Sequence, residues 1–187
     1  MSVPRSTLSV LVENKFGVLA RVATIIAGRG FHIQSLAVGE TEDPTTSRMT
    51  IVVEGDARTI DQMKKQLNRM IDVITVQDLT KGEFIDRELM LVRVAVTTKT
   101  RAEVLEIAQS VKAKVDDVGV KSVVLQVVGD AAKIHTAIAL LKPFGIKEIV
   151  RTGRVALSRE VQPESAKVMG IKDFVAGHKI TIGFRFE

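Results

Sequence analysis

The sequence has no cysteine, no tryptophan and no tyrosine among its 187 residues. A chain without cysteine has no disulfide, no cysteine-ligated zinc or iron–sulfur site and no thiol nucleophile. It also has no run of about 18 apolar residues, which a membrane-spanning helix would need. The amino terminus Met1–Arg5 lacks the charged start and apolar stretch of a secretion signal. We therefore expect a cytoplasmic protein.

Motifs for metal binding and catalysis are missing as well. The three histidines, His32, His135 and His178, lack the paired spacing of a metal site. The stretch Gly28–Gly30 follows a predicted helix, whereas a dinucleotide fingerprint opens a helix after a strand, so we interpret it as a helix end. The sequence has no Walker loop and no nucleophile elbow, and no pair of carboxylates is spaced for acid–base catalysis. We expect no catalytic residue, no metal and no cofactor in this chain.

The two halves of the sequence repeat one pattern. Apolar, glycine and aspartate landmarks recur 74 residues later (125 − 51 = 74): Ile51, Gly55, Asp56, Ala57, Ile60 and Leu67 are matched by Leu125, Gly129, Asp130, Ala131, Ile134 and Leu141. Helical positions at i, i+3, i+4 and i+7 recur 85 residues later: Leu19, Val22, Ala23 and Ile26 are matched by Val104, Ile107, Ala108 and Val111. The first copy therefore has eleven more residues than the second between these two sets of landmarks (85 − 74 = 11). These extra residues fall at Gly39–Ser47, which we predict to be a long hairpin loop.

Each copy has the order strand, helix, strand, strand, helix, strand. In the first copy we predict strands at 8–13, 32–38, 48–54 and 73–79 and helices at 18–28 and 60–71; the second runs from Glu88 to about Ser158. Asp56 and Asp130 are expected to cap helices, and Thr100 with Glu103 suggests a capping box. The fold class is therefore α+β, two tandem ferredoxin-like βαββαβ domains. We expect domains at 1–80 and 81–160, and a tail of unknown role at 161–187.

Both faces of the first sheet are partly apolar. Leu11 and Val52 are out of phase with the core positions of their strands. Because one layer of helices covers only one face, we expect a second sheet on the other, from the other repeat or another protomer. This pattern favours self-association over a monomer.

The turn between the first strand and the first helix, Glu13–Leu19, is the candidate binding site. Free backbone N–H groups and the positive end of the helix dipole meet there, which favours a carboxylate. Gly17 has no side chain to block close approach, and Asn14 can both donate and accept hydrogen bonds, as an amino acid would require. The alternative is an ordinary strand-to-helix turn.

Several motifs resemble one family. The segments Leu8–Asn14, Gly17–Val22, Arg29–Phe31, Ser35–Gly39 and Ser47–Ile51 resemble the amino-terminal ACT domain of the small regulatory subunit of acetohydroxyacid synthase (acetolactate synthase). The segments Arg87–Leu91 and Arg151–Arg159 are similar to the start and end of that family's second domain. The resemblance covers about Leu8 to Arg159.

The resemblance implies a regulatory function in branched-chain amino acid (valine, leucine, isoleucine) biosynthesis. A member would form a homodimer through its ACT domains, bind valine at the dimer interface, dock on the large catalytic subunit, stimulate it and confer valine feedback inhibition. Such a chain is not catalytic alone. Thiamine diphosphate, magnesium and FAD would belong to the catalytic subunit, a transferase.

The same resemblance assigns the effector site. The family's asparagine and glycine after the first strand match Asn14 and Gly17, and His32 stands where the family has a second asparagine that reaches the ligand from the neighbouring protomer. We expect the valine carboxylate near the amides of Gly17 and Val18, beside Leu19, and the valine side chain near Ile33. Whether valine is the effector depends on the departure at His32.

Two alternatives remain at the level of sequence. One is a free-standing tandem ACT sensor of another pathway. The other is an RNA-binding module, since RNA-recognition domains share this order of elements. Those domains stack bases on aromatic strand residues, and the seven phenylalanines here fall at predicted turns, helix ends and the tail. Lysine and arginine exceed aspartate and glutamate only by 27 to 22, without clustering, so we expect no nucleic-acid partner.

Overall fold

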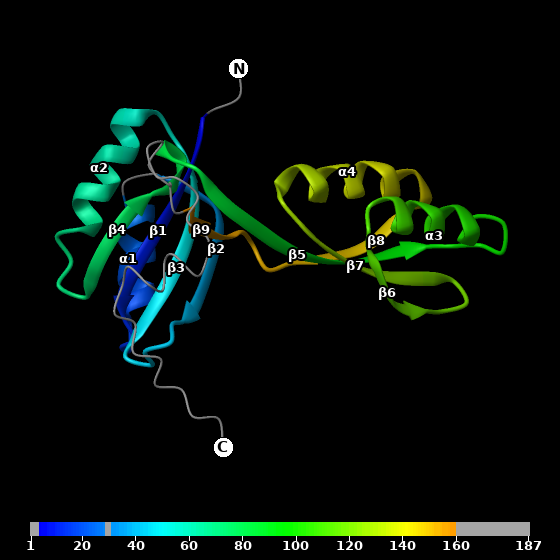
Figure 1. Ribbon diagram of the computed structural model, residues 1–187, viewed down its shortest axis with the longest axis horizontal. Helices are drawn as coiled ribbons and strands as arrows, with labels where there is room; N and C mark the ends of the chain where they lie inside the picture. The colour runs from blue at the N-terminus through cyan, green and yellow to red at the C-terminus, as the bar shows by residue number, and fades with distance from the viewer. Residues whose placement is uncertain (1–3, 29–30, 160–187) are drawn as a thin grey trace, which may run out of the picture.

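The computed structural model describes residues 4–28 and 31–159, which form two units joined along one long strand (Figure 1). The first unit contains β1 (Arg5–Glu13), α1 (Val18–Ala27), β2 (His32–Glu40), β3 (Thr46–Glu54), α2 (Ala57–Leu67) and β4 (Val73–Asp78), followed by the short helix η1 (Leu79–Lys81). The second contains β5 (Phe84–Ala95), α3 (Arg101–Ser110), β6 (Lys114–Val118), β7 (Ser122–Gly129), α4 (Ala131–Leu141), η2 (Lys142–Phe144), β8 (Ile146–Arg151) and β9 (Val155–Ser158).

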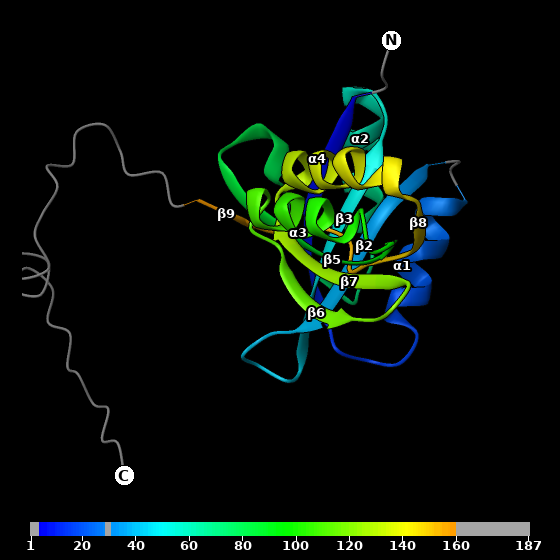
Figure 2. The same cartoon turned by 90° about the vertical axis from the view of Figure 1, so that its right-hand side faces the viewer.

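Each unit is an antiparallel sheet with two helices on one face. The strand orders are β2-β3-β1-β4 and β6-β7-β5-β8. Figure 2 shows α3 and α4 together on one side of the second sheet. The predicted pair of tandem ferredoxin-like domains is confirmed. None of the described helices is long and apolar enough to cross a membrane.

The repeat landmarks form two separate cores. Ile51 on β3 and Leu125 on β7 are fully buried, each between its sheet and its own two helices. Asp56 and Asp130 cap α2 and α4 by accepting from the N–H groups of Thr59 and Lys133. The same sequence signals therefore act in the same way in both copies.

Three local predictions are wrong. The hairpin loop is shorter than expected, because β2 continues to Glu40 and β3 begins at Thr46, leaving only 41–45 between them. The second helix was predicted at 60–71 but spans Ala57–Leu67, because its Asp56 cap sets the start. The capping box at Thr100 is absent, since its hydroxyl bonds to the N–H of Thr97 at 3.0 Å.

The second face of the first sheet is covered by a strand pair from the second unit. β9 pairs with the first residues of β5, from Phe84 to Arg87, and this β5–β9 ribbon lies over β1 and β3. Val52 is 2% exposed as a result, and Ala156 of β9 is also buried. Of the two sources expected for this cover, the other repeat or another protomer, the other repeat provides it over Val52, whereas Leu11 remains half-buried.

Candidate functional site

The turn from β1 to α1 presents free backbone donors. Gly17 caps α1 with φ 80° and ψ −6°, in the left-handed region that favours glycine. The N–H groups of Leu19 and Ala20 have no acceptor among the described residues, and that of Val18 makes only a 3.3 Å bond to the carbonyl of Lys15. The first turn of α1 contains no acidic residue and no side-chain cap. This helix end therefore leaves its positive dipole available to an anion.

Asn14 holds the neighbouring hairpin loop in place. Its Nδ2 donates to Oε1 of Glu40 and to the carbonyl of Pro44, both at 3.0 Å, and its backbone N–H donates to the carbonyl of Thr45 at 2.7 Å. Both amide hydrogens are thus used within the chain, and Oδ1 is the side-chain atom left to accept a hydrogen bond from a ligand. Asn14 and Gly17 lie in the same exposed turn.

Arg21 is a charged residue of this turn that the sequence analysis missed. Its Nη1 lies 3.3 Å from the position that a Cβ on Gly17 would occupy. Its Nε and Nη2 donate to Oδ2 of Asp72, at 3.1 and 2.7 Å. Its position four residues after Gly17 could have predicted this contact, because helical side chains lean back toward the amino terminus of the helix. The guanidinium adds a positive charge beside the free N–H groups.

Other features surround this turn. Lys15 pairs with Glu13 at 2.7 Å, and the hydrogen bond to Glu13 raises the pKa of Lys15. Beside Arg21 and Asp72 lies an open apolar hollow of about 700 Å³, lined by residues of α1 and of the loop before β4, including Ile25, Met70 and Ile71. Neither feature was part of the sequence prediction.

The predicted site residues separate into two groups within one chain. Asn14, Gly17, Val18 and Leu19 lie together, with Val18 buried and Leu19 exposed. His32 and Ile33 lie at the other end of the sheet: His32 pairs with Glu54, whereas Glu40, close to Asn14, pairs with Ser47. Eight residues of strand separate the two ends of β2, about 27 Å at a rise near 3.4 Å.

His32 and Ile33 differ in exposure. His32 is exposed, and Ile33 is half-buried against the core of the first domain. The described residues contain no group of three or more histidines, aspartates and glutamates placed to hold a metal ion. His135 is exposed on α4, and His178 lies outside the described residues.

Comparison with known proteins gives consistent results for both units. Residues 8–75 match the family described as "AHAS small subunit-like ACT domain", and residues 87–160 match "Small subunit of acetolactate synthase". The acetolactate synthase small subunit of Aquifex aeolicus is 48% identical over 160 residues, covering 85% of this chain and 83% of that protein. The probable acetolactate synthase small subunit of Archaeoglobus fulgidus is 46% identical over 155 residues, covering 83% of this chain and 97% of that protein.

A solved structure agrees with these matches. The acetolactate synthase small subunit from Thermotoga maritima has 34% sequence identity and a TM-score of 0.78, covering 86% of this chain and 100% of that one. At 86% of this chain, the aligned part includes residues of both domains. The chain therefore belongs to the family of acetolactate synthase small, regulatory subunits.

Proposed function

We propose that this chain regulates acetolactate synthase in branched-chain amino acid biosynthesis by stimulating the large catalytic subunit and making it sensitive to valine. The chain contributes no catalytic group. In this proposal the first domain, residues 1–80, senses the amino acid, and thiamine diphosphate, magnesium and FAD belong to the catalytic subunit. Family membership supports the partner, and the geometry of the β1–α1 turn supports the effector.

The single observation that carries the effector site is the free amino-terminal end of α1. A carboxylate at this end would accept from backbone N–H groups near Gly17 and interact with the Arg21 guanidinium. The Oδ1 atom of Asn14 would accept a hydrogen bond from the ammonium group. A small zwitterion therefore fits the charges of this turn.

The second half of the site comes from another protomer in this proposal. β2 is an edge strand of the first sheet, and edge strands can pair with a copy of themselves. Antiparallel pairing of two β2 strands about a twofold axis near Leu36 brings His32 of the partner subunit opposite Glu40. The distance between the two groups of site residues within one chain is the reason that the site needs a homodimer.

Valine would regulate by favouring one arrangement of this dimer. For inhibition it must bind more tightly to the less active state of the holoenzyme, and a tenfold preference corresponds to about 1.4 kcal/mol. The free-standing sensor is the second candidate, because the tandem ACT-like fold alone is compatible with it. Co-purification with a large catalytic subunit distinguishes the two.

The test is to add the purified chain to its catalytic subunit and to assay acetolactate formation with and without valine. We expect stimulation without valine and inhibition with it. Gly17→Asp should abolish the response to valine and preserve stimulation, because it places a carboxylate at the proposed carboxylate site. Gly82→Asp is the control, since Gly82 has open space around it and no positive φ. The absence of both stimulation and inhibition would contradict the proposal.

A further inference from the structure

The segment Gly153–Ala156, here called the junction, includes the turn after β8 and the first two residues of β9, and it contacts three strands of the first domain. The N–H of Arg154 donates to Oγ of Ser35 on β2 at 2.8 Å. Nη1 of Arg154 donates to Oγ1 of Thr7 on β1 at 3.1 Å, and the N–H of Ala156 donates to Oγ1 of Thr50 on β3 at 3.3 Å. The junction is therefore hydrogen-bonded across the outer face of the first sheet.

Close approach at the junction requires glycine at position 153. Gly153 has φ 79°, and a Cβ there would lie 2.6 Å from Oγ of Ser35 and 3.5 Å from the carbonyl oxygen of Leu36. Both the backbone conformation and the space exclude a larger residue without movement. Gly153 thus brings the backbone of the second domain directly against β2.

Arg154 and Arg151, just before the junction, also make ion pairs with β5. Arg151 makes a two-pronged contact with Glu88, with N–O distances of 2.5 and 2.9 Å. Nε of Arg154 lies 3.0 Å from Oδ2 of Asp86, and both side chains are mostly buried. Such bidentate pairs fix geometry as well as contributing energy. Over four residues, the chain passes from a fixed contact in the second sheet to a fixed contact with β2.

The rest of the boundary near β2 is open. A cavity of about 350 Å³ lies between β2, at Gln34–Leu36, and α4, at Ala131 and His135. Within residues 4–28 and 31–159, the bond from Arg154 to Ser35 is the only hydrogen bond between β2 and the second domain. The hydrogen-bonded route from β2 to the second domain therefore runs through the junction.

We propose that the contact of Ser35 with Gly153 and Arg154 couples β2 to the second domain and makes that domain responsive to the effector. The inference rests on the proposed function, in which the two β2 strands of a homodimer pair and the amino acid binds at their interface. Ser35 lies at an irregularity in the β2–β3 pairing, close to Ile33. Ser35, Gly153 and Arg154 are positioning residues. They do not touch the ligand, and they transmit a displacement of β2 to the second domain.

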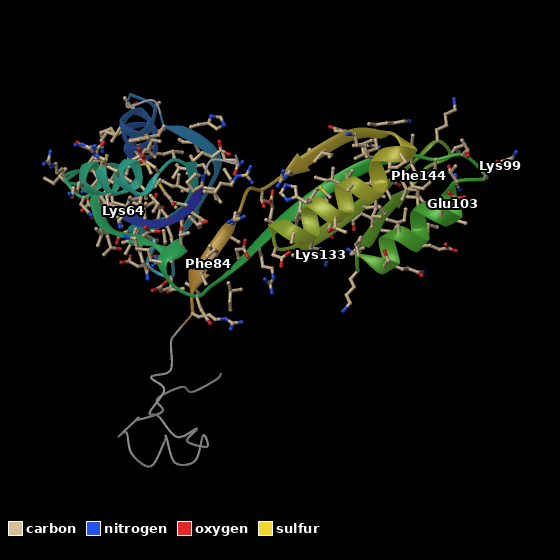
Figure 3. The ribbon with its side chains drawn as sticks, turned by 90° about the horizontal axis from the view of Figure 1, so that it is seen from above. Lys64, Phe84, Lys99, Glu103, Lys133 and Phe144 are labelled. Atoms are coloured by element: carbon tan, nitrogen blue, oxygen red, sulfur yellow. The ribbon has the colours of Figure 1, made fainter. Side chains whose placement is uncertain are left out.

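The test measures the distance between the two domains in the full-length chain. Because the sequence has no cysteine, spin labels can be placed uniquely on Lys65→Cys in α2 and on Lys99→Cys at the far end of the second domain, where Figure 3 shows Lys99. The labelled chain is diluted with unlabelled chain and measured by electron spin resonance. We expect a narrow distance distribution for the intact junction, shifted by valine.

Two variants break the junction and one serves as a control. Ser35→Ala removes the acceptor of the Arg154 N–H, whereas Arg154→Ala keeps that backbone bond and removes the side-chain contacts with Thr7 and Asp86. In Ser35→Ala we expect a broader distribution that valine does not shift, and in Arg154→Ala a broader distribution, while calorimetry gives valine affinity within about threefold of the original for both. In the holoenzyme these variants should keep stimulation and lose most of the inhibition. Ser9→Ala is the control, because Ser9 is buried on the same face and its Oγ accepts from Arg48 of the same domain; it should behave like the unsubstituted chain.

The outcomes separate this inference from the proposed function. Unchanged distance distributions in both junction variants would overturn the inference. If the unsubstituted chain does not bind valine, the proposed effector is wrong, and the width of the distribution in the junction variants still decides the role of the junction in domain orientation.

A thermal experiment tests the close approach itself. Gly153→Ala should lower the unfolding temperature, and Ser35→Ala in the same chain should restore part of that loss, because the atom that a Cβ meets is gone. Strictly additive effects would mean that the two residues are not in contact and would overturn the inference.

Discussion

Arg21 on α1 and Asp72 in the loop before β4 form an ion pair with N–O distances of 2.7 and 3.1 Å, beside Gly17. The pair holds the start of α1 against the end of the first sheet, since the carbonyl of Asp72 also accepts from the N–H of Glu13 at 2.9 Å. Arg21 lies beside Gly17 in the candidate site, and Asp72 holds the Arg21 guanidinium in place.

Removing Arg21 and removing Asp72 should have different effects on the affinity for valine. Asp72 is largely buried, so Arg21→Ala should cost about 1–3 kcal/mol of unfolding free energy by leaving its carboxylate unpaired. It should also weaken valine binding about tenfold, a typical effect of losing a charged partner. Asp72→Ala should destabilise the fold but preserve valine affinity. Calorimetry and urea unfolding measure both quantities, and equal losses of affinity in the two variants would contradict the role of Arg21.

His32→Asn should strengthen valine binding. The variant introduces the asparagine that the sequence resemblance places at this position, and a neutral amide can both donate to a carboxylate and accept from an ammonium group. We expect a severalfold lower dissociation constant by calorimetry and inhibition at lower valine concentration. Gln34→Asn, two residues along the same strand, is the control. A weaker affinity for valine in His32→Asn would argue against a contact at this position.

The cap of α2 makes a prediction about pH. The hydrogen bonds from Thr59 lower the pKa of the Asp56 carboxyl group below its ordinary value. Because this pKa is lower in the folded state, the cap contributes to stability above the unfolded-state pKa of about 3.9, and the contribution is lost as the pH falls through the lower folded-state value. Carboxyl NMR titration should give a pKa for Asp56 below that of an unfolded peptide. Asp56→Asn should remove this part of the pH dependence.

The two cores should respond separately to mutation. Ile51→Ala and Leu125→Ala each remove a fully buried side chain at equivalent positions of the repeat, and each should cost about 2–5 kcal/mol in its own domain. Hydrogen exchange should show increased opening in β1–β4 for the first variant and in β5–β8 for the second. Equal loss of protection in both sheets from either variant would mean that the two cores unfold as one unit.

The sequence predicted the features that depend on local pattern. The repeat, the helix caps at Asp56 and Asp130 and the glycine at the start of α1 all follow from residue type and spacing, and the structure contains them. The candidate turn was found in the same way, because free N–H groups are a property of any uncapped helix start. The assignment of His32 to a neighbouring protomer came from family resemblance and remains a prediction.

Long-range contacts were not predictable from pattern alone. Arg154 and Ser35 are 119 positions apart in the chain, and no periodicity links them. The short strand β9 follows a glycine with positive φ, which interrupts the alternation expected of one continuous strand. The orientation of Arg21 toward Gly17 depends on its ion pair with Asp72, which lies on a different element. The first two features require the folded arrangement of both domains, and the orientation of Arg21 requires that of the first domain.

The claim that one effector site is built from two protomers can be tested most directly with mixed dimers. Gly17→Asp and His32→Asp should each abolish valine binding in a homodimer, because each places a carboxylate beside the carboxylate of valine and the two repel each other. In a mixed dimer, one of the two sites at the interface combines the unsubstituted Gly17 of one chain with the unsubstituted His32 of the other, and that site is intact. We predict that purified mixed dimers contain about half of the valine sites of the unsubstituted dimer, counted by calorimetry. No restoration in verified mixed dimers would contradict a site shared across the interface.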